Sequence, residues 1–223
     1  MESLLAAICR NGEAMKFLHV DLRRLILVVV SVILMGFFIS FLNPCGFGSD
    51  PCTVMNLAIS GKIGWSLGNW QATLNCILFI FVLLFGRNQL GWGTIANMFL
   101  VGYSFDFFTW VNSFWLPEQA FENMAVRVIV ATVALLGFVV VASAYMACDL
   151  GTAPYDALCF IIASHQKKFS FRVVRILYDG FACLVAVIFG TKLGAVTIAM
   201  VFLLGPVITW MKENVIEKYL PLK

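Results

Sequence analysis

The stretch CGFGSDP, at residues 45–51, follows a long apolar run and has a counterpart, CDLGTAP, at residues 148–154. Glycine allows positive φ and close approach of the backbone, serine or threonine can cap a helix, and proline is favoured in the first helical turn. Both stretches therefore predict a tight turn followed by a short helix. We expect these helices to run from Pro51 to about Ser60 and from Pro154 to about Ser164.

The composition around these turns is that of an integral membrane protein. Of the 223 residues, 61% are hydrophobic and 12% are charged, and the mean hydropathy is +0.94. A typical soluble domain carries about 25% charged residues. The net charge of +3 is read by position, because basic residues in a membrane protein report topology before partners. We therefore expect the lipid bilayer, and not nucleic acid, as the partner of this chain.

Apolar segments long enough to span a bilayer flank both turns. A span needs roughly 20 mostly apolar residues. Six segments qualify or nearly qualify: 25–44, 70–86, 91–114, 125–147, 174–190 and 194–211. We divide the chain into a cytoplasmic N-terminal segment (1–24), a first membrane repeat (25–114), a linker (115–124), a second membrane repeat (125–211) and a cytoplasmic tail (212–223).

Internal similarity supports the division into two units. A shift of 103 residues places CGFGSDP on CDLGTAP, and it places LGWGTIANMFLVG (90–102) on LGAVTIAMVFLLG (193–205) with 8 of 13 positions identical. Hydrophobic bias alone would not align glycines, a proline and a threonine in order. The predicted fold is all-α, with two tandem repeats of about 103 residues, each containing three long transmembrane helices and one short helix led by glycine and proline.

Two topologies remain open for the short helices. If each one re-enters the membrane, the halves are inverted and there are six spans; if each one crosses, the halves are parallel and there are eight. Inverted halves would place 12 basic residues inside and 3 outside, and parallel halves would place 13 inside and 2 outside. The positive-inside rule therefore gives cytoplasmic termini in both cases. A re-entrant tip at HQKK (165–168) would bury lysines at a cost of about 3 kcal/mol each. We therefore favour crossing helices and parallel halves.

The paired motifs resemble those of the YczE/YyaS/YitT type of bacterial membrane proteins, and the YczE-like branch most closely. The shared features are turns of the form GxGxxP or LGxxPxDxL, a GxSxG-like stretch (WSLGN, 65–69) and a tight LGxGTxxNxxxxG helix. Together they cover the chain from about Gly36 to Trp210. The resemblance implies a small multi-pass protein of the bacterial cytoplasmic membrane. It implies little about chemistry, because this family is largely uncharacterised.

The two halves depart from the family pattern in different ways. Cys52 and Thr53 stand where the second turn has Tyr155 and Asp156, the residues that the pattern prefers. KKFSFR (167–172) replaces the GxSxG-like stretch in the second half. These departures indicate that the first turn has diverged in its contacts with a ligand.

Ionisable residues inside membrane segments are costly and are therefore functional candidates. Asp50 and Asp156 flank the two motif prolines, and each has a structural explanation as a helix cap or as a charge at the positive end of a helix. Asp179 follows Arg175 by four residues, which predicts a local ion pair. Asp106 has no basic residue within one turn, so its charge needs a partner on another helix, a water-filled cavity or a proton.

Two glycine-led helix N-termini predict a binding site between the two turns. Their free N–H groups favour an anion or a carboxylate, and transporters built from repeats use broken helices in this way. We expect a transporter of a small solute, either an ion or an anionic or carboxylate-bearing molecule; close packing of short helices with no ligand is the structural alternative. The candidate substrate-binding residues are Gly48, Ser49, Asp50, Pro51, Asn75, Asp106, Gly151, Thr152, Pro154, Asp156 and Asp179, while Asn75 and Asn97 could instead be interhelical hydrogen-bonding groups.

A second class of function is compatible with these features. An accessory or regulatory membrane subunit with no substrate of its own is the alternative. We expect no enzyme activity, catalytic residue or cofactor, because the two histidines lie in polar flanks. The seven cysteines form no CxxC pair, so we expect no metal site. The small size of the chain favours a homodimer or a partner membrane subunit.

Overall fold

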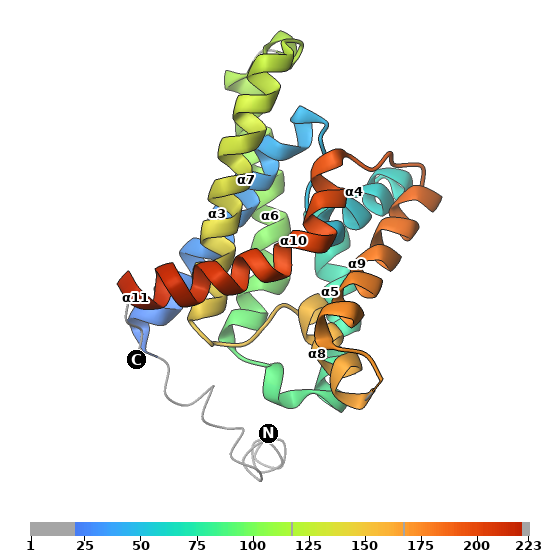
Figure 1. Ribbon diagram of the computed structural model, residues 1–223. Coiled ribbons are helices and arrows are strands. Elements are labelled where there is room, and N and C mark those ends of the chain that lie inside the picture. Colours follow the sequence, from blue (N-terminus) through green and yellow to red (C-terminus); the bar gives the residue numbers. More distant parts are fainter. Residues whose placement is uncertain (1–20, 117, 167, 220–223) are drawn as a thin grey trace.

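The computed structural model describes residues 21–116, 118–166 and 168–219, so most of the N-terminal segment and the last four residues of the tail lie outside the described residues. The described chain is almost entirely helical and contains no strand (Figure 1). The expected all-α integral membrane fold is confirmed. The main helices are α3 (Leu22–Cys45), α4 (Pro51–Ile63), α5 (Leu67–Phe85), α6 (Trp92–Trp115), α7 (Met124–Ala147), α8 (Pro154–His165), α9 (Phe171–Ile188) and α10 (Ala195–Met211).

Four helices in the described chain are long and apolar enough to cross a membrane. They are α3, α5, α7 and a continuous helix, Ala195–Tyr219, in which α10 is extended by a π-helical turn and by α11 (Glu217–Tyr219). The other two expected spans also form helices. α6 has 24 residues but includes Asn97 and Asp106, and α9 has 18 residues and carries Arg175 and Asp179. These two helices are less apolar than the other spans because they carry polar groups toward the interior.

The first helices of the two halves, α3 and α7, run in opposite directions (Figure 1). Near the end of α3, the carbonyl of Cys45 accepts a hydrogen bond of 2.8 Å from Nε of Arg127, at the start of α7. Near the other end of the pair, Val28 packs in one cluster with Tyr145 and Cys148. Parallel halves would require these helices to run in the same direction. Our interpretation of parallel halves is therefore wrong.

The short helices begin in the middle of the fold and lead outward. α4 packs on α9, with Val54 and Ala58 against Ala186, while α8 packs on α5, with Ala157 against Val82. The N-terminal turns of both short helices line one shared cavity. The buried tip of each segment is thus the glycine–proline turn, and α8 carries its last residues back to the surface. The expectation that HQKK (165–168) forms the buried tip is therefore wrong. The cost of burying lysines there does not count against a re-entrant segment.

Each turn docks on the first residues of the last helix in the opposite half. The amide of Val196 donates to the carbonyl of Phe47 at 3.0 Å, and the amide of Gly93 donates to the carbonyl of Leu150 at 2.7 Å. The shift of 103 residues maps Phe47 onto Leu150 and Gly93 onto Val196, so the two contacts are equivalent. The duplication of the chain stays a prediction, and these matched contacts are what a duplicated unit would produce.

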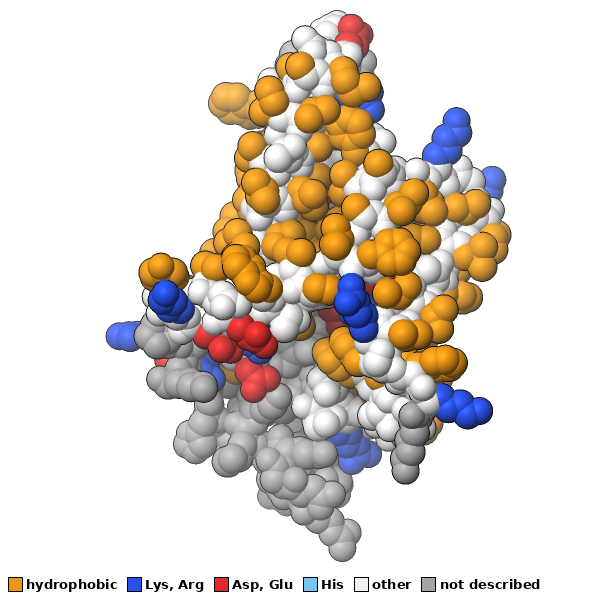
Figure 2. All heavy atoms as spheres, viewed as in Figure 1, with side chains coloured by type: hydrophobic (Ala, Val, Ile, Leu, Met, Phe, Trp, Pro, Cys, Tyr) orange, Lys and Arg blue, Asp and Glu red, His pale blue; other side chains and the backbone are white. Residues whose placement is uncertain are grey.

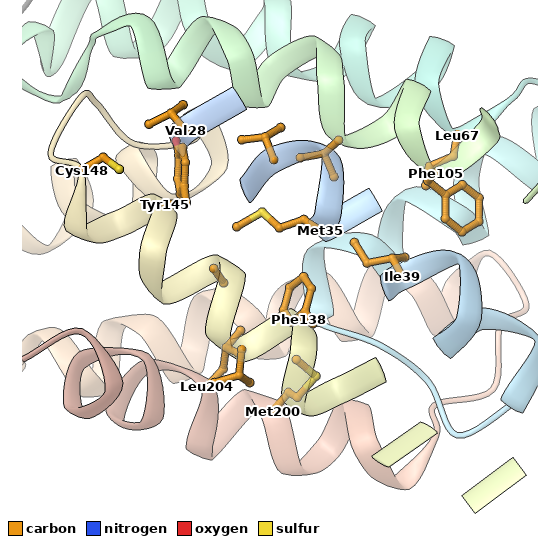
Figure 3. Packing of buried hydrophobic residues seen from close by; sticks show 14 of the residues in the cluster. Val28, Met35, Ile39, Leu67, Phe105, Phe138, Tyr145, Cys148, Met200 and Leu204 are labelled. Atoms are coloured by element: carbon orange, nitrogen blue, oxygen red, sulfur yellow. The ribbon is translucent and has the colours of Figure 1, made fainter. Parts of the chain in front are cut away.

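The hydrophobic core lies between α3, α6, α7 and α10. Figure 3 shows Met35, Ile39 and Phe138 converging, with Met200 and Leu204 beside them. The outside is also apolar, because hydrophobic side chains spread over most of the face seen in Figure 2. This exposed apolar surface is expected of helices whose solvent is lipid.

Candidate functional site

The N-terminal ends of α4 and α8 meet at a central cavity of about 260 Å³. Residues from α3, α5, α6, α7, α9 and α10 complete its walls. Most of the lining is apolar, with polar groups at a few positions. The polar groups that matter for its chemistry are Asp50, Asn75, Asn97, Asp156, Arg175 and Asp179.

One wall of the cavity carries an arginine shared by two carboxylates. Nη1 of Arg175 lies 2.5 Å from Oδ1 of Asp156, and Nε of Arg175 lies 2.9 Å from Oδ2 of Asp179. The hydroxyl of Tyr155 donates to Oδ1 of Asp179 at 3.0 Å. The local pair predicted between Arg175 and Asp179 is confirmed. This cluster also joins the first turn of α8 to the middle of α9.

Asp50 approaches the cavity from the other turn and is only 8% exposed. Its Oδ2 accepts a hydrogen bond of 3.0 Å from the amide of Thr53, and its Oδ1 accepts one of 3.2 Å from the hydroxyl of Ser49. It therefore caps α4, as the sequence suggested. No ion pair joins Asp50 to any residue that the structure describes. A buried carboxylate in this position needs a cation or a proton to offset the cost of desolvation.

Carboxamide side chains from α5 and α6 also line the cavity, at Gln71, Asn75 and Asn97. Nδ2 of Asn75 donates to the carbonyl of Met98 at 3.3 Å, which leaves the side-chain oxygen of Asn75 available. Asn97 is 8% exposed and Gln71 is 7% exposed. Within the described chain, the Asn97 side chain makes no hydrogen bond and Oε1 of Gln71 has no partner. Buried polar groups are usually hydrogen-bonded, so these groups are available to bind water or a solute in the cavity.

The structure brings only part of the predicted site together. Asp50, Pro51, Asn75, Asp156 and Asp179 line the cavity. Gly48, Ser49, Gly151, Thr152 and Pro154 do not line it, and they shape the two turns behind the lining residues. The two predicted turns therefore meet at the cavity through some of their residues, while the other residues shape the backbone behind its lining, and ligand contact stays a prediction for all of them.

Asp106 lies outside the cavity. Its Oδ2 accepts a hydrogen bond of 2.8 Å from the amide of Gly68, in the first turn of α5, where Ser66 is the N-cap. The carboxylate therefore has the interhelical partner that its position on α6 required. This contact also satisfies one of the free amides at the start of α5.

Sequence reasoning did not include Gln71, Asn97 or Arg175 among the substrate-binding residues. Arg175 was recognised as a partner of Asp179, and the four-residue spacing on a helix was the available signal. Asn97 was recognised as a polar residue in a membrane helix, but its direction depends on how α6 packs. Gln71 has no distinguishing pattern in the sequence.

The chain matches a family of unknown function (DUF6198) over residues 22–213. It belongs to this family. Two relatives from Bacillus subtilis (strain 168) are also uncharacterised. The membrane protein YczE is 27% identical over 115 residues, which are 52% of this chain and 51% of YczE. The protein YyaS is 23% identical over 178 residues, which are 79% of this chain and 86% of YyaS.

These matches confirm the resemblance to YczE and YyaS found in the sequence motifs. The match to YczE spans about half the length of that relative. No solved structure is significantly similar to this chain. The family match and the apolar helices together identify a multi-pass membrane protein.

Proposed function

We propose that this protein is a membrane transporter that holds a small solute in the central cavity. One observation carries the proposal: two short helices from oppositely oriented halves begin at the same cavity, in the middle of the fold. Transporters with inverted repeats place their substrate sites at such broken helices near the bilayer midplane. The protein needs no chemical step for this function, so the proposal includes no catalytic residue.

The buried charges support a cavity with a function. Asp50, Asp156, Arg175 and Asp179 all line it, and ionisable groups at membrane depth are expensive. A purely structural role could account for the cluster around Arg175, because that cluster ties α8 to α9. Capping of α4 accounts for the hydrogen bonds of Asp50 but leaves its charge without a cation in the described chain, and no structural contact there uses the carboxamide of Asn97.

We also propose that the protein lies in a bacterial cytoplasmic membrane with both termini in the cytoplasm. The start of α3 and the end of α11 lie at the same end of the molecule (Figure 1), as an even number of crossings requires. Arg87 and Lys168 follow helices that run toward this end. The positive-inside rule then places this end in the cytoplasm.

The direct test is solute exchange in liposomes that contain the purified full chain. The liposomes are loaded with labelled small amines, amino acids, carboxylates or sugars, and loss of label is compared with protein-free liposomes. We expect at least one solute to exchange faster with the protein present. Ala142 lines the cavity, so Ala142→Leu should slow this exchange, while Ala125→Leu, at an exposed position of the same helix, should not.

The outcome also separates transport from the alternative function. Folded protein that exchanges no member of the panel would contradict transport and favour an accessory membrane subunit. Exchange that Ala142→Leu leaves unchanged would place the solute path outside the cavity.

A further inference from the structure

The charges around the cavity point away from the anionic solute expected from the sequence. That expectation relied on free N–H groups at two helix N-termini. In the structure, Asp50 accepts the hydrogen bond of the Thr53 amide, and Asp156 lies in the first turn of α8. The positive ends of both short helices therefore already face carboxylates of their own chain. An anion would have to displace them or lie beside them.

We infer that the solute is a small organic cation whose ammonium group binds at Asp50. This inference rests on the proposed function for transport, and the binding site itself can be tested without it. Three carboxylates line the cavity, at Asp50, Asp156 and Asp179, against one guanidinium, at Arg175. Arg175 already contacts Asp156 and Asp179 at 2.5 and 2.9 Å, so Asp50 has no cationic partner in the described chain.

The carboxamide wall provides a second, independent indication of a ligand. Asn97 lines the cavity, is 8% exposed, and makes no side-chain hydrogen bond to the residues that the structure describes. Asn75 lines the same cavity and uses only its amide nitrogen, toward Met98. An ammonium group has three N–H donors and no acceptor. Asp50 and the side-chain oxygens of Asn75 and Asn97 are acceptors that match these donors.

The apolar lining favours an organic cation over a bare metal ion. Met35, Ile39, Val101, Phe138 and Leu204 all face the cavity. Its volume of about 260 Å³ is several times the roughly 30 Å³ that one water occupies in the liquid. Among the described residues, no group of three histidine, cysteine or acidic side chains could hold a metal ion. A solute with an ammonium head and a short apolar body fits these walls.

The test measures binding to the purified full chain by thermal shift and calorimetry. The probes are methylammonium, n-butylammonium and the butane-1,4-diammonium ion, with n-butanol and butyrate as neutral and anionic counterparts of similar size. We expect at least one ammonium probe to raise the melting temperature, and the counterparts to have no effect. Asp50→Asn should weaken binding at least tenfold, and Asn97→Ala should weaken it several-fold.

Asp50→Asn is a suitable variant because asparagine caps helices as well as aspartate does, so α4 should still form. Asp106→Asn is the matched control, since Asp106 lies outside the cavity, and it should bind the probe like the wild type. No shift with any ammonium probe would overturn the inference. Equal binding by wild type and Asp50→Asn would overturn it too.

The results separate this inference from the proposed function. An ammonium probe that binds at Asp50 but does not cross the liposome membrane would support the cation site and contradict transport. Exchange of a carboxylate without binding of any ammonium probe would support transport and contradict the cation site.

Discussion

Gly48 lies against Thr197 so closely that a Cβ on the glycine would overlap the threonine hydroxyl. The neighbouring amide of Ser49 donates to this same hydroxyl at 3.2 Å. In the opposite half, Gly151 packs in the same way on Thr94. Both threonines are fully buried. Each re-entrant turn is thus anchored to a helix of the other half, and this anchoring positions the two short helices at the cavity.

The first prediction concerns this contact. Gly48→Ala should lower the free energy of unfolding, because Gly48 has φ of 91° and no room for a Cβ. The left-handed backbone costs about 1–2 kcal/mol for an L-residue, and overpacking adds about 1–3 kcal/mol. Thermal unfolding in detergent measures the change. Gly180→Ala is the control, since open space surrounds Gly180 on α9, and its melting temperature should not fall.

A second prediction concerns the arginine of the charged wall. Arg175→Met should destabilise the protein by about 3 kcal/mol or more, because it leaves two carboxylates facing each other without a cation. Arg172→Met, at an exposed position of the same helix, should have little effect. Denaturant unfolding of the two variants is the measurement.

Neutralising the carboxylates together with the arginine provides the decisive comparison. Replacing buried ionic groups by neutral ones of similar shape is often close to neutral for stability. Arg175→Met combined with Asp156→Asn and Asp179→Asn should therefore recover most of the lost stability. A triple variant no more stable than Arg175→Met would show that packing of the guanidinium, and not its charge, accounts for the effect.

The third prediction separates Asp106 from the aspartates of the cavity. Asp106→Ala should cost about 0.5–2 kcal/mol of stability, the range for losing a side-chain hydrogen bond to a free amide at a helix N-terminus. Solute exchange per folded molecule should stay at the wild-type rate. Liposome assays corrected for the folded fraction test this, and loss of exchange in a fully folded Asp106→Ala protein would return Asp106 to the functional site.

Much of the fold could be predicted from the sequence because its signals are local. Apolar length locates the long helices, and the glycines and prolines near Pro51 and Pro154 mark where the short helices begin. The direction of the two halves is not local. The basic residues fit both topologies about equally well, and long-range contacts such as that of Cys45 with Arg127 show that α3 and α7 are antiparallel.

The candidate site was predictable to a similar extent. Asp50 and Asp156 stand beside motif prolines, so their convergence could be inferred from the paired turns. Gln71 and Asn97 are single polar residues in apolar helices, and whether they face lipid, another helix or a cavity depends on helix rotation. The expected anionic solute stays a prediction, but its premise is weakened because the aspartates themselves occupy the helix ends that were expected to be free.

The fourth prediction tests the topology in the membrane. Single cysteines at Lys62, Arg87, Lys168 and Lys192, introduced one at a time in a background without the native cysteines, are labelled in intact cells by an impermeant maleimide. All four positions are exposed.

Inverted halves place Lys62 and Lys192 on the outer side, and Arg87 and Lys168 on the inner side, where labelling requires permeabilised cells. Parallel halves would place Lys62 with Lys168 inside and Arg87 with Lys192 outside. Grouping of Lys62→Cys with Lys168→Cys on one side, and of Arg87→Cys with Lys192→Cys on the other, would contradict the arrangement seen in the structure, whichever side is outside.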